Sequence, residues 1–379
     1  SRTAREAIKI MTDLVQEYGY YSGGESFTIA DPNEVWIMEM IGKGPGIRGA
    51  VWVAVRVPDD CISAHANQAR IHQFDMNDKE NCMYSPDVVS FAREKGYFNG
   101  VNKDFSFSLA YAPLDFGARR FCEARVWSYF NKFTDRGNEY LPYIEGKTDT
   151  PMPLFVKPKQ KLSVQDVKNM MRDHYEGTPL DISNDFGAGP YKTPYRLSPL
   201  NFKVDDKEYF NERPISTQQS GFVFVAQMRA HMPDPVGGVL WFGVDDANMT
   251  VFTPVYCCAT KVPVCYTRVD GADYITFSWN SAFWIFNWVS NMVYPRYDLM
   301  IGDVRETQKE MESTFNTAQA GIEEMAVKLL EKDKDAAINF LTNYTNMTAQ
   351  STFDTWKQLG TFLIVKLSLI HISEPTRPY

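Results

Sequence analysis

The sequence contains no apolar run of 18 residues, the length at which a segment becomes a candidate membrane span. It has no stretch rich in lysine and arginine, and its formal net charge of -8 argues against nucleic acid as a partner. No two cysteines have C-x-x-C spacing, and the motifs of phosphate loops, dinucleotide-binding folds and H-E-x-x-H zinc sites are missing. No metal and no cofactor are therefore expected.

What is present is an ordinary globular composition. The chain has 379 residues, of which 44% are hydrophobic and 14% are aromatic. A chain of this size can bury a large core without disulfide bonds. We therefore predict buried, free thiols for the six cysteines, which are Cys61, Cys82, Cys122, Cys257, Cys258 and Cys265.

The first residues predict an amphipathic helix over about 1–20. Apolar side chains recur at helical spacing up to Val15, and Ser1 or Thr3 is the candidate cap. The sequence lacks an initiator methionine and a signal peptide, so we expect it to begin inside a domain.

The last residues have an unusual origin in this interpretation. Back-translated, Leu367–Arg377 resembles the mosaic-end adaptor of transposase-based sequencing libraries. We expect residues 367–379 to be a cloning or sequencing artefact and the domain to span 1–366, with a short terminal strand as the alternative.

The segments after the first helix predict an antiparallel sheet. Runs rich in β-branched and aromatic residues alternate with turn signals such as "DPN". The predicted strands cover 25–31, 34–41, 50–57 and 61–68. Helices are predicted over "SPDVVSFAREKGYF", capped by Ser85, and over "DFGARRFCEARVWSYFNKF".

The second half predicts another sheet followed by long helices. Residues 140–214 are rich in proline and polar residues, which favours a loop-rich insertion with one helix near 163–175. The predicted strands are 220–230, 237–246, 249–260 and 274–280. A near-heptad stripe from Ile301 to Leu329 predicts one long helix, and a last helix is predicted over about 352–366. The order favours an α+β fold with layered sheets and helices outside.

Two local clusters are candidates for function. Cys61, His65 and Asn67 are the residue types of a thiol protease, but on a strand Cys61 and His65 would lie about 13 Å apart, too far for a nucleophile and its base. The strand would still present a polar face to a cleft. The cluster Trp279, Phe283, Trp284, Phe286 and Trp288 favours core packing, with a carbohydrate platform as the alternative.

Several long motifs, in order, resemble those of the PepD-type dipeptidases. They are "GESFTIADPNEVWIMEMIGKGPG", "GAVWVAVRVPDDCISAHANQARI", "FSLAYAPLDFGARRFCEARVWSYFNKF", "GGVLWFGVDDA" and "WNSAFWIFNWVSNMVYPRYDLMIGDVRETQKEME". The resemblance covers nearly all of 1–366. It implies an αββα sandwich of the N-terminal-nucleophile hydrolases, related to penicillin V acylase and bile salt hydrolase, incomplete at its N-terminus in this sequence.

The resemblance also implies a mechanism in which a terminal cysteine attacks an amide carbonyl. Its own α-amino group acts as the base, since such an amine titrates near pH 8 and lies a few bonds from the thiol. That cysteine is expected upstream of Ser1, so this chain is expected to be inactive. Ser1 itself is rejected as a nucleophile because it opens an amphipathic helix.

The resemblance assigns two site residues. Asn67 is the candidate oxyanion donor, with a strand-end asparagine that makes local backbone hydrogen bonds as the alternative. Arg120 in "DFGARRF" is the candidate for steadying the nucleophile or the substrate carboxylate, with a solvated helix arginine as the alternative; Arg119 is the fallback because the spacing differs by one residue. Two candidate substrate-binding residues come from the expected strands. Glu39, late in a core strand, is a candidate partner for the free amine of a dipeptide, with ordinary ion pairing as the alternative, and His65 shares the strand face of Asn67, with a hydrogen-bonded core histidine as the alternative.

Two alternatives to a dipeptidase remain open. The same chemistry permits an amidase acting on N-acyl amino acids or bile-acid conjugates, and the same scaffold occurs in secernin-like interaction proteins without a catalytic role. Export to the periplasm or beyond is favoured by the resemblance alone, and the oligomeric state stays unknown.

Overall fold

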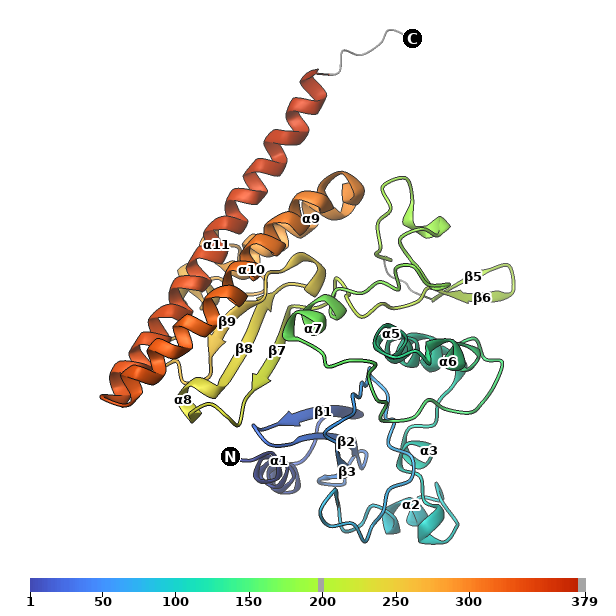
Figure 1. The fold of residues 1–379 in the computed structure, drawn as a ribbon. Coiled ribbons are helices and arrows are strands. Elements are labelled where there is room, and N and C mark those ends of the chain that lie inside the picture. The colour runs from blue at the N-terminus through green and yellow to red at the C-terminus, as the bar shows by residue number, and fades with distance from the viewer. Residues whose placement is uncertain (197–200, 374–379) are drawn as a thin grey trace. The chain divides into compact units, whose positions relative to one another are not determined.

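The computed structural model of the protein describes residues 1–196 and 201–373 (Figure 1). The chain divides into two compact units, Ser1–Leu162 and Ser163–Tyr379. Each unit contains its own antiparallel sheet and its own helices, which confirms the α+β class. The αββα sandwich and the single domain over 1–366 concern the arrangement of both units together and stay predictions.

The first unit is built on a four-stranded antiparallel sheet in the order β1-β2-β3-β4. Its strands are β1 (Gly24–Ala30), β2 (Val35–Gly42), β3 (Ala50–Arg56) and β4 (Cys82–Tyr84). Its α-helices are α1 (Ala4–Tyr18), α2 (Ser90–Glu94), α3 (Phe107–Tyr111), α4 (Phe116–Ala118), α5 (Ala124–Phe133) and α6 (Gly137–Ile144). A short π-helix, Arg119–Glu123, joins α4 to α5.

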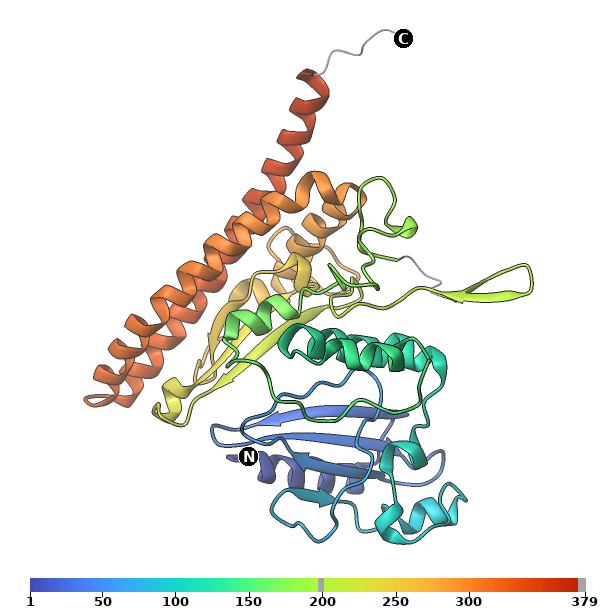
Figure 2. The same cartoon turned by 45° about the vertical axis from the view of Figure 1, so that its right-hand side comes forward.

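Helix α1 confirms the prediction for the first residues. The Thr3 side chain accepts a hydrogen bond from the Glu6 backbone N–H, so Thr3 is the cap. Helix α1 covers one face of the sheet (Figure 2). There Ile8, which is fully buried, packs with Trp36 and Met40 of β2. Burial of a side chain such as Ile8 contributes about 1.5–3 kcal/mol.

Strand β2 is buried on both faces. Trp36, Met38 and Met40 face α1, whereas Ile37 packs on the opposite side with a second core that includes Ile71. This double coverage explains why five consecutive residues of β2 are buried, rather than every second one.

The predicted strand over 61–68 is wrong. Only Ile62 has a strand-like partner, Val156, in an isolated bridge, and the fourth strand of the sheet is β4. Side chains bind this segment in place of a neighbouring strand: the Ser63 hydroxyl donates to Leu154 O at 2.6 Å, and Arg70 Nη1 donates to Ala64 O at 2.9 Å. The residues of 61–68 therefore do not share one strand face.

Two helix predictions in this unit have different outcomes. The predicted cap Ser85 is wrong, because α2 begins only at Ser90 and the Ser85 hydroxyl accepts a hydrogen bond from Trp52 N instead. The predicted long helix over 115–133 is confirmed, with Asp115 as its cap. The π-helix within it places an extra residue in one turn and shifts which residues face a given direction.

The second unit is built on a three-stranded antiparallel sheet in the order β7-β8-β9. Its strands are β7 (Phe222–Met228), β8 (Gly238–Val244) and β9 (Thr253–Tyr256), and a separate hairpin is formed by β5 (Asn201–Val204) and β6 (Lys207–Phe210). Its α-helices are α7 (Val164–Met170), α8 (Asp234–Gly237), α9 (Ala282–Val293), α10 (Tyr297–Leu330) and α11 (Lys334–Ser373).

Helices α9, α10 and α11 pack with the sheet of this unit around one core, and α10 and α11 lie side by side in both views (Figures 1 and 2). The rings of Phe286 and Trp356 stack at 4.8 Å and are fully buried. Core packing is thus confirmed for Phe286, whereas Trp279 is half exposed. The carbohydrate platform stays untested.

The remaining predictions for this half are partly right. Strands β7, β8 and β9 and the long helix α10 are confirmed, and Ser163 caps α7 within the loop-rich stretch 140–214. The predicted strand over 274–280 is wrong, because Asp273 Oδ1 accepts from the N–H groups of Ile275 and Thr276 and forms a turn.

The last helix is longer than predicted, since α11 starts at Lys334 and continues to Ser373. Residues 374–379 lie outside the described part, and the artefact origin of 367–379 stays a prediction. Within the described residues, no helix combines the length and the apolar character that crossing a membrane requires.

Candidate active site

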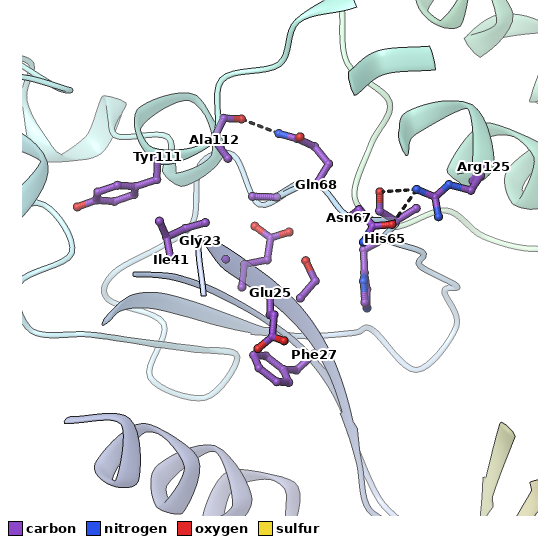
Figure 3. A pocket seen from close by; sticks show the side chains of 15 residues that line it. Gly23, Glu25, Phe27, Ile41, His65, Asn67, Gln68, Tyr111, Ala112 and Arg125 are labelled. Carbon is purple, nitrogen blue, oxygen red and sulfur yellow. Dashed lines mark hydrogen bonds between the residues drawn. The ribbon is translucent and has the colours of Figure 1, made fainter. Parts of the chain in front are cut away.

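A cavity of about 630 Å³ opens in the first unit beside strand β1 (Figure 3). Its lining residues come from strands β1 and β2, from the segment that contains Asn67, from the end of α3 and from α5. The lining residues are Gly23, Gly24, Glu25, Ser26, Phe27, Glu39, Ile41, His65, Ala66, Asn67, Gln68, Ala69, Tyr111, Ala112 and Arg125. Three of the four site residues predicted from the sequence, Glu39, His65 and Asn67, therefore share one cavity.

A buried ion pair holds the segment that carries these residues. Arg70 Nε lies 2.8 Å from Glu123 Oε1, and both side chains are 3% exposed. Arg70 also donates through Nη1 to Ala64 O at 2.9 Å and through Nη2 to Pro153 O at 3.2 Å. Because Glu123 belongs to the helix that continues into α5, this pair ties the segment firmly to that helix.

Asn67 is held in a left-handed backbone conformation, with φ of 56°. Its Oδ1 accepts from Arg125 Nη2 at 2.9 Å, and the same Nη2 lies 3.3 Å from Ala66 O (Figure 3). Since a guanidinium can only donate, the Arg125 contact fixes which side of the amide is oxygen. The Nδ2 group, with its two N–H donors, lies on the other side of the amide.

The sequence pattern did not indicate a role for Arg125. Its Nε donates to Phe121 O at 2.8 Å, which keeps the guanidinium pointed at Asn67. The residue lies five positions after Arg120, across the π-helix. An α-helix with 3.6 residues per turn would predict a different direction for the Arg125 side chain, because the π-helix adds one residue to the preceding turn. The only sequence signal was a third arginine in "FCEAR" soon after the arginine pair.

The structure does not bring Arg120 or Arg119 into the lining of this cavity. Arg120 Nη1 lies 3.3 Å from Ile144 O. Arg119 donates to Thr148 O at 3.1 Å and to Asp149 at 3.0 Å, and it lines a separate cavity of about 310 Å³. The catalytic role assigned to Arg120, with Arg119 as its fallback, stays a prediction.

Glu39 lines the cavity but is completely buried. Its Oε1 accepts from Arg70 N at 2.5 Å, and its Oε2 accepts from Ile71 N at 3.0 Å. Burial raises the pKa of the Glu39 carboxyl to about 7, although both backbone donors and the Arg70 charge act in the opposite direction. Both carboxylate oxygens therefore bind the backbone of Arg70 and Ile71, just after the segment that contains Asn67.

His65 is neutral at neutral pH. Burial lowers the pKa of its imidazole to about 4, with a further lowering from the Arg70 charge. Its Nε2 lies 2.9 Å from Thr28 Oγ1, so the ring links the segment before Asn67 to strand β1. An imidazole with so low a pKa is a poor base near pH 7, but it can still form this hydrogen bond.

All six cysteines are free, as predicted, but only three are fully buried, and Cys257 is exposed. None of the six lines the cavity. Burial raises the pKa of Cys61 and raises that of Cys82 to about 11, which keeps these groups as weakly nucleophilic thiols. Within residues 1–196 and 201–373, no group of three or more His, Cys, Asp or Glu side chains is arranged to hold a metal ion.

Comparison with known proteins places the chain in a family of peptidases. The family described as "Peptidase family C69" matches residues 1–310, and the chain belongs to this family. The resemblance noted from the motifs is confirmed at this level.

Curated relatives carry dipeptidase names. A "Probable dipeptidase" of Salmonella dublin is 30% identical over 258 residues, which cover 68% of this chain and 52% of the relative. A "Probable dipeptidase" of Latilactobacillus sakei is 27% identical over 364 residues, covering 95% and 68%. "Dipeptidase A" of Lactobacillus helveticus is 23% identical over 284 residues, covering 75% and 52%. The chain thus spans about half to two thirds of the length of these relatives.

Proposed function

We propose that the intact protein hydrolyses small peptides, chiefly dipeptides, through an N-terminal cysteine that lies upstream of Ser1. Membership of Peptidase family C69 and the names of the relatives support this activity. The observation that carries the proposal is the Asn67 amide, which lines the cavity and is oriented by Arg125.

In the proposed reaction the cysteine sulfur attacks the carbonyl carbon of the substrate. Its α-amino group takes the thiol proton and then delivers it to the leaving amine as the C–N bond breaks. The product of this step is a thioester. Water then attacks the thioester carbonyl, the S–C bond breaks, and the sulfur recovers its proton.

Each tetrahedral intermediate places a negative charge on the former carbonyl oxygen. The Nδ2 group of Asn67 supplies two N–H donors for that charge, and the Arg125 contact holds the amide so that little reorganisation is needed. We therefore propose that Arg125 positions Asn67, a part different from the one that the resemblance gives Arg120, which is to steady the nucleophile or the substrate carboxylate. This choice rests on the direct Arg125–Asn67 hydrogen bond.

The other two assigned residues take supporting parts in the proposal. Glu39 holds the backbone of Arg70 and Ile71, three and four residues after Asn67, rather than binding a substrate amine. His65 connects the same segment to Thr28 and borders the space in which substrate would lie.

The experiment compares the intact parent protein with its Asn67→Ala variant on dipeptides. We expect kcat to fall by about 10²–10³ with little change in KM, because the lost donor acts mainly in the transition state. Asn99→Ala, an exposed asparagine of the same unit, is the matched control and should keep full activity. An Asn67→Ala variant with the parent's kcat would refute the assignment.

Two further assays address the alternatives. N-acyl amino acids and bile-acid conjugates, tested in parallel with dipeptides, distinguish an amidase by the ratio of kcat/KM values. A mature N-terminus without cysteine in the parent would favour the non-catalytic protein. The 379-residue chain alone is expected to be inactive, and thiol-dependent cleavage of dipeptides by it would overturn the upstream nucleophile.

A further inference from the structure

Cys257 and Cys258 are neighbours in the sequence and occupy the two central positions of a tight turn. The turn follows strand β9 and is closed by Ala259 N, which donates to Tyr256 O at 2.9 Å. All six cysteines of the chain are free thiols, and only these two are adjacent in the sequence. The Cα atoms of adjacent residues are about 3.8 Å apart, so the covalent chain itself keeps these two thiols near one another.

The turn is anchored on two elements of the second unit, strand β8 and helix α11 (Figure 1). The N–H of the first cysteine donates to Gly238 O, in the first residue of β8, at 3.0 Å. On the helix side, Tyr256 N donates to Thr345 Oγ1 at 3.2 Å. Just after the turn, Thr260 N donates to Thr342 Oγ1 at 3.1 Å. These hydrogen bonds lie within one unit and hold the backbone on both sides of the thiol pair.

The two thiols differ in their access to solvent. Cys257 is exposed, and its Sγ lies beside Gly238, where an added Cβ would be 3.1 Å from the sulfur. Cys258 is half-buried and packs against the core of the second unit. A reagent in solution therefore meets the sulfur of Cys257 first, and Cys258 supplies a second thiol directly beside it.

The ionisation of the two thiols is linked. Burial raises the pKa of both thiols, and the charge of an ionised Cys257 raises the pKa of Cys258 further. The second effect requires the two sulfurs to lie close together, and it disfavours two thiolates at the same time. Once Cys257 has formed a covalent bond and carries no charge, this part of the increase disappears and the Cys258 thiol ionises more readily.

We propose that Cys257 and Cys258 form a redox modification site, which a small-molecule disulfide oxidises to a reversible Cys257–Cys258 disulfide. The Cys257 thiolate attacks one sulfur of the reagent, forms a mixed disulfide and releases one small thiol. The Cys258 thiolate then attacks the Cys257 sulfur, the mixed S–S bond breaks, and the second small thiol leaves. The protein loses two protons and two electrons, and the reagent gains them. This inference goes beyond the proposed peptidase function and does not rest on it.

The geometry of adjacent cysteines makes the resulting disulfide easy to reduce. In most disulfides the two Cα atoms are about 4.4–6.8 Å apart, whereas adjacent residues are restricted to about 3.8 Å. A disulfide outside the usual geometry is strained, and a strained, accessible disulfide is reduced more readily than a structural one. The oxidised turn is therefore a reversible modification and not a structural cross-link.

The experiment treats the 379-residue chain with glutathione disulfide at about pH 8 and follows the intact mass and a peptide map. We expect the peptide that contains both cysteines to lose two hydrogen atoms, and dithiothreitol to restore both thiols. Cys258→Ser lacks the second thiol, so this variant should stop at the mixed disulfide on Cys257. Cys61→Ser removes a half-buried cysteine of the first unit and is the matched control, which should react like the unmodified chain.

Several results would overturn the proposal. A mixed disulfide on Cys257 that persists in the unmodified chain would show that the Cys258 thiol does not reach that sulfur. A disulfide that links either residue to a different cysteine, such as the buried Cys265, or the absence of any reaction at both thiols, would also refute it. The intact parent should form the same disulfide, and a parent in which Cys257 stays a free thiol would contradict the assignment. None of these readouts depends on the cleavage of dipeptides.

Discussion

The carboxyl group of Glu39 lies beneath the cavity, fully buried, and its protonation should be visible in the stability of the first unit. Burial raises the pKa of Glu39 from its ordinary 4.5 to about 7 in the folded chain. A raised pKa means that the folded state favours the protonated form. The resulting stabilisation is complete below the unfolded value of 4.5 and is lost as the pH rises through about 7.

The magnitude follows from these two pKa values. Proton linkage between the folded and unfolded chain gives a loss of about 2.5 kcal/mol in the free energy of unfolding from pH 5 to pH 8. The substitution Glu39→Gln keeps the size of the side chain and an oxygen for Arg70 N and Ile71 N, but it cannot ionise. Its stability should therefore vary less with pH than that of the unmodified chain by about this amount.

The assay is amide hydrogen exchange of peptides from β2 and β3, combined with denaturant unfolding at pH 5 and pH 8. The exposed Glu94 of α2 is the matched control, since Glu94→Gln should leave the pH dependence of the unmodified chain in place. If the Glu39→Gln variant and the unmodified chain have parallel curves of stability against pH, then Glu39 is ionised in the folded state throughout, and the argument from its burial is refuted.

Three further substitutions test the buried ion pair and the packing of the long helices. Glu123→Ala should lower the free energy of unfolding by about 3–5 kcal/mol, because Arg70 is left charged and buried without its partner. Denaturant unfolding measures this loss, and a loss below about 1 kcal/mol would contradict a tight buried pair. In α11, a Cβ at Gly360 would lie 2.2 Å from the Trp288 ring, so Gly360→Ala should destabilise by about 1–3 kcal/mol. Gly321→Ala, at an open position of α10, should instead stabilise by about 0.5–1 kcal/mol, and equal melting temperatures for the two alanine variants would count against this packing.

Local sequence signals predicted those elements whose stabilising groups are close in the chain. Thr3 caps α1 through Glu6, three residues away, and the turn after Asp31 joins β1 to β2. Long helix α10 follows from its apolar stripe. In each case the periodicity and the capping side chain act within one or two turns, so the sequence pattern is sufficient.

The candidate site was only partly predictable for the opposite reason. Asn67, His65 and Glu39 do share a cavity, but the strand expected to carry His65 and Asn67 is absent. Its backbone is bound by Arg70, whose partner Glu123 is 53 residues away. Alternation of polar and apolar residues cannot reveal a segment held by such a distant ion pair.

The sequence by itself therefore determined the family, the α+β class, the β1–β2 hairpin and the long helix α10, because these depend on extended motifs and on contacts between near neighbours. Only the tertiary structure decided which arginine meets Asn67, since a π-helix alters the direction of Arg125. It also decided the burial of Glu39, which raises the pKa of its carboxyl group. That property is set only when distant segments pack together.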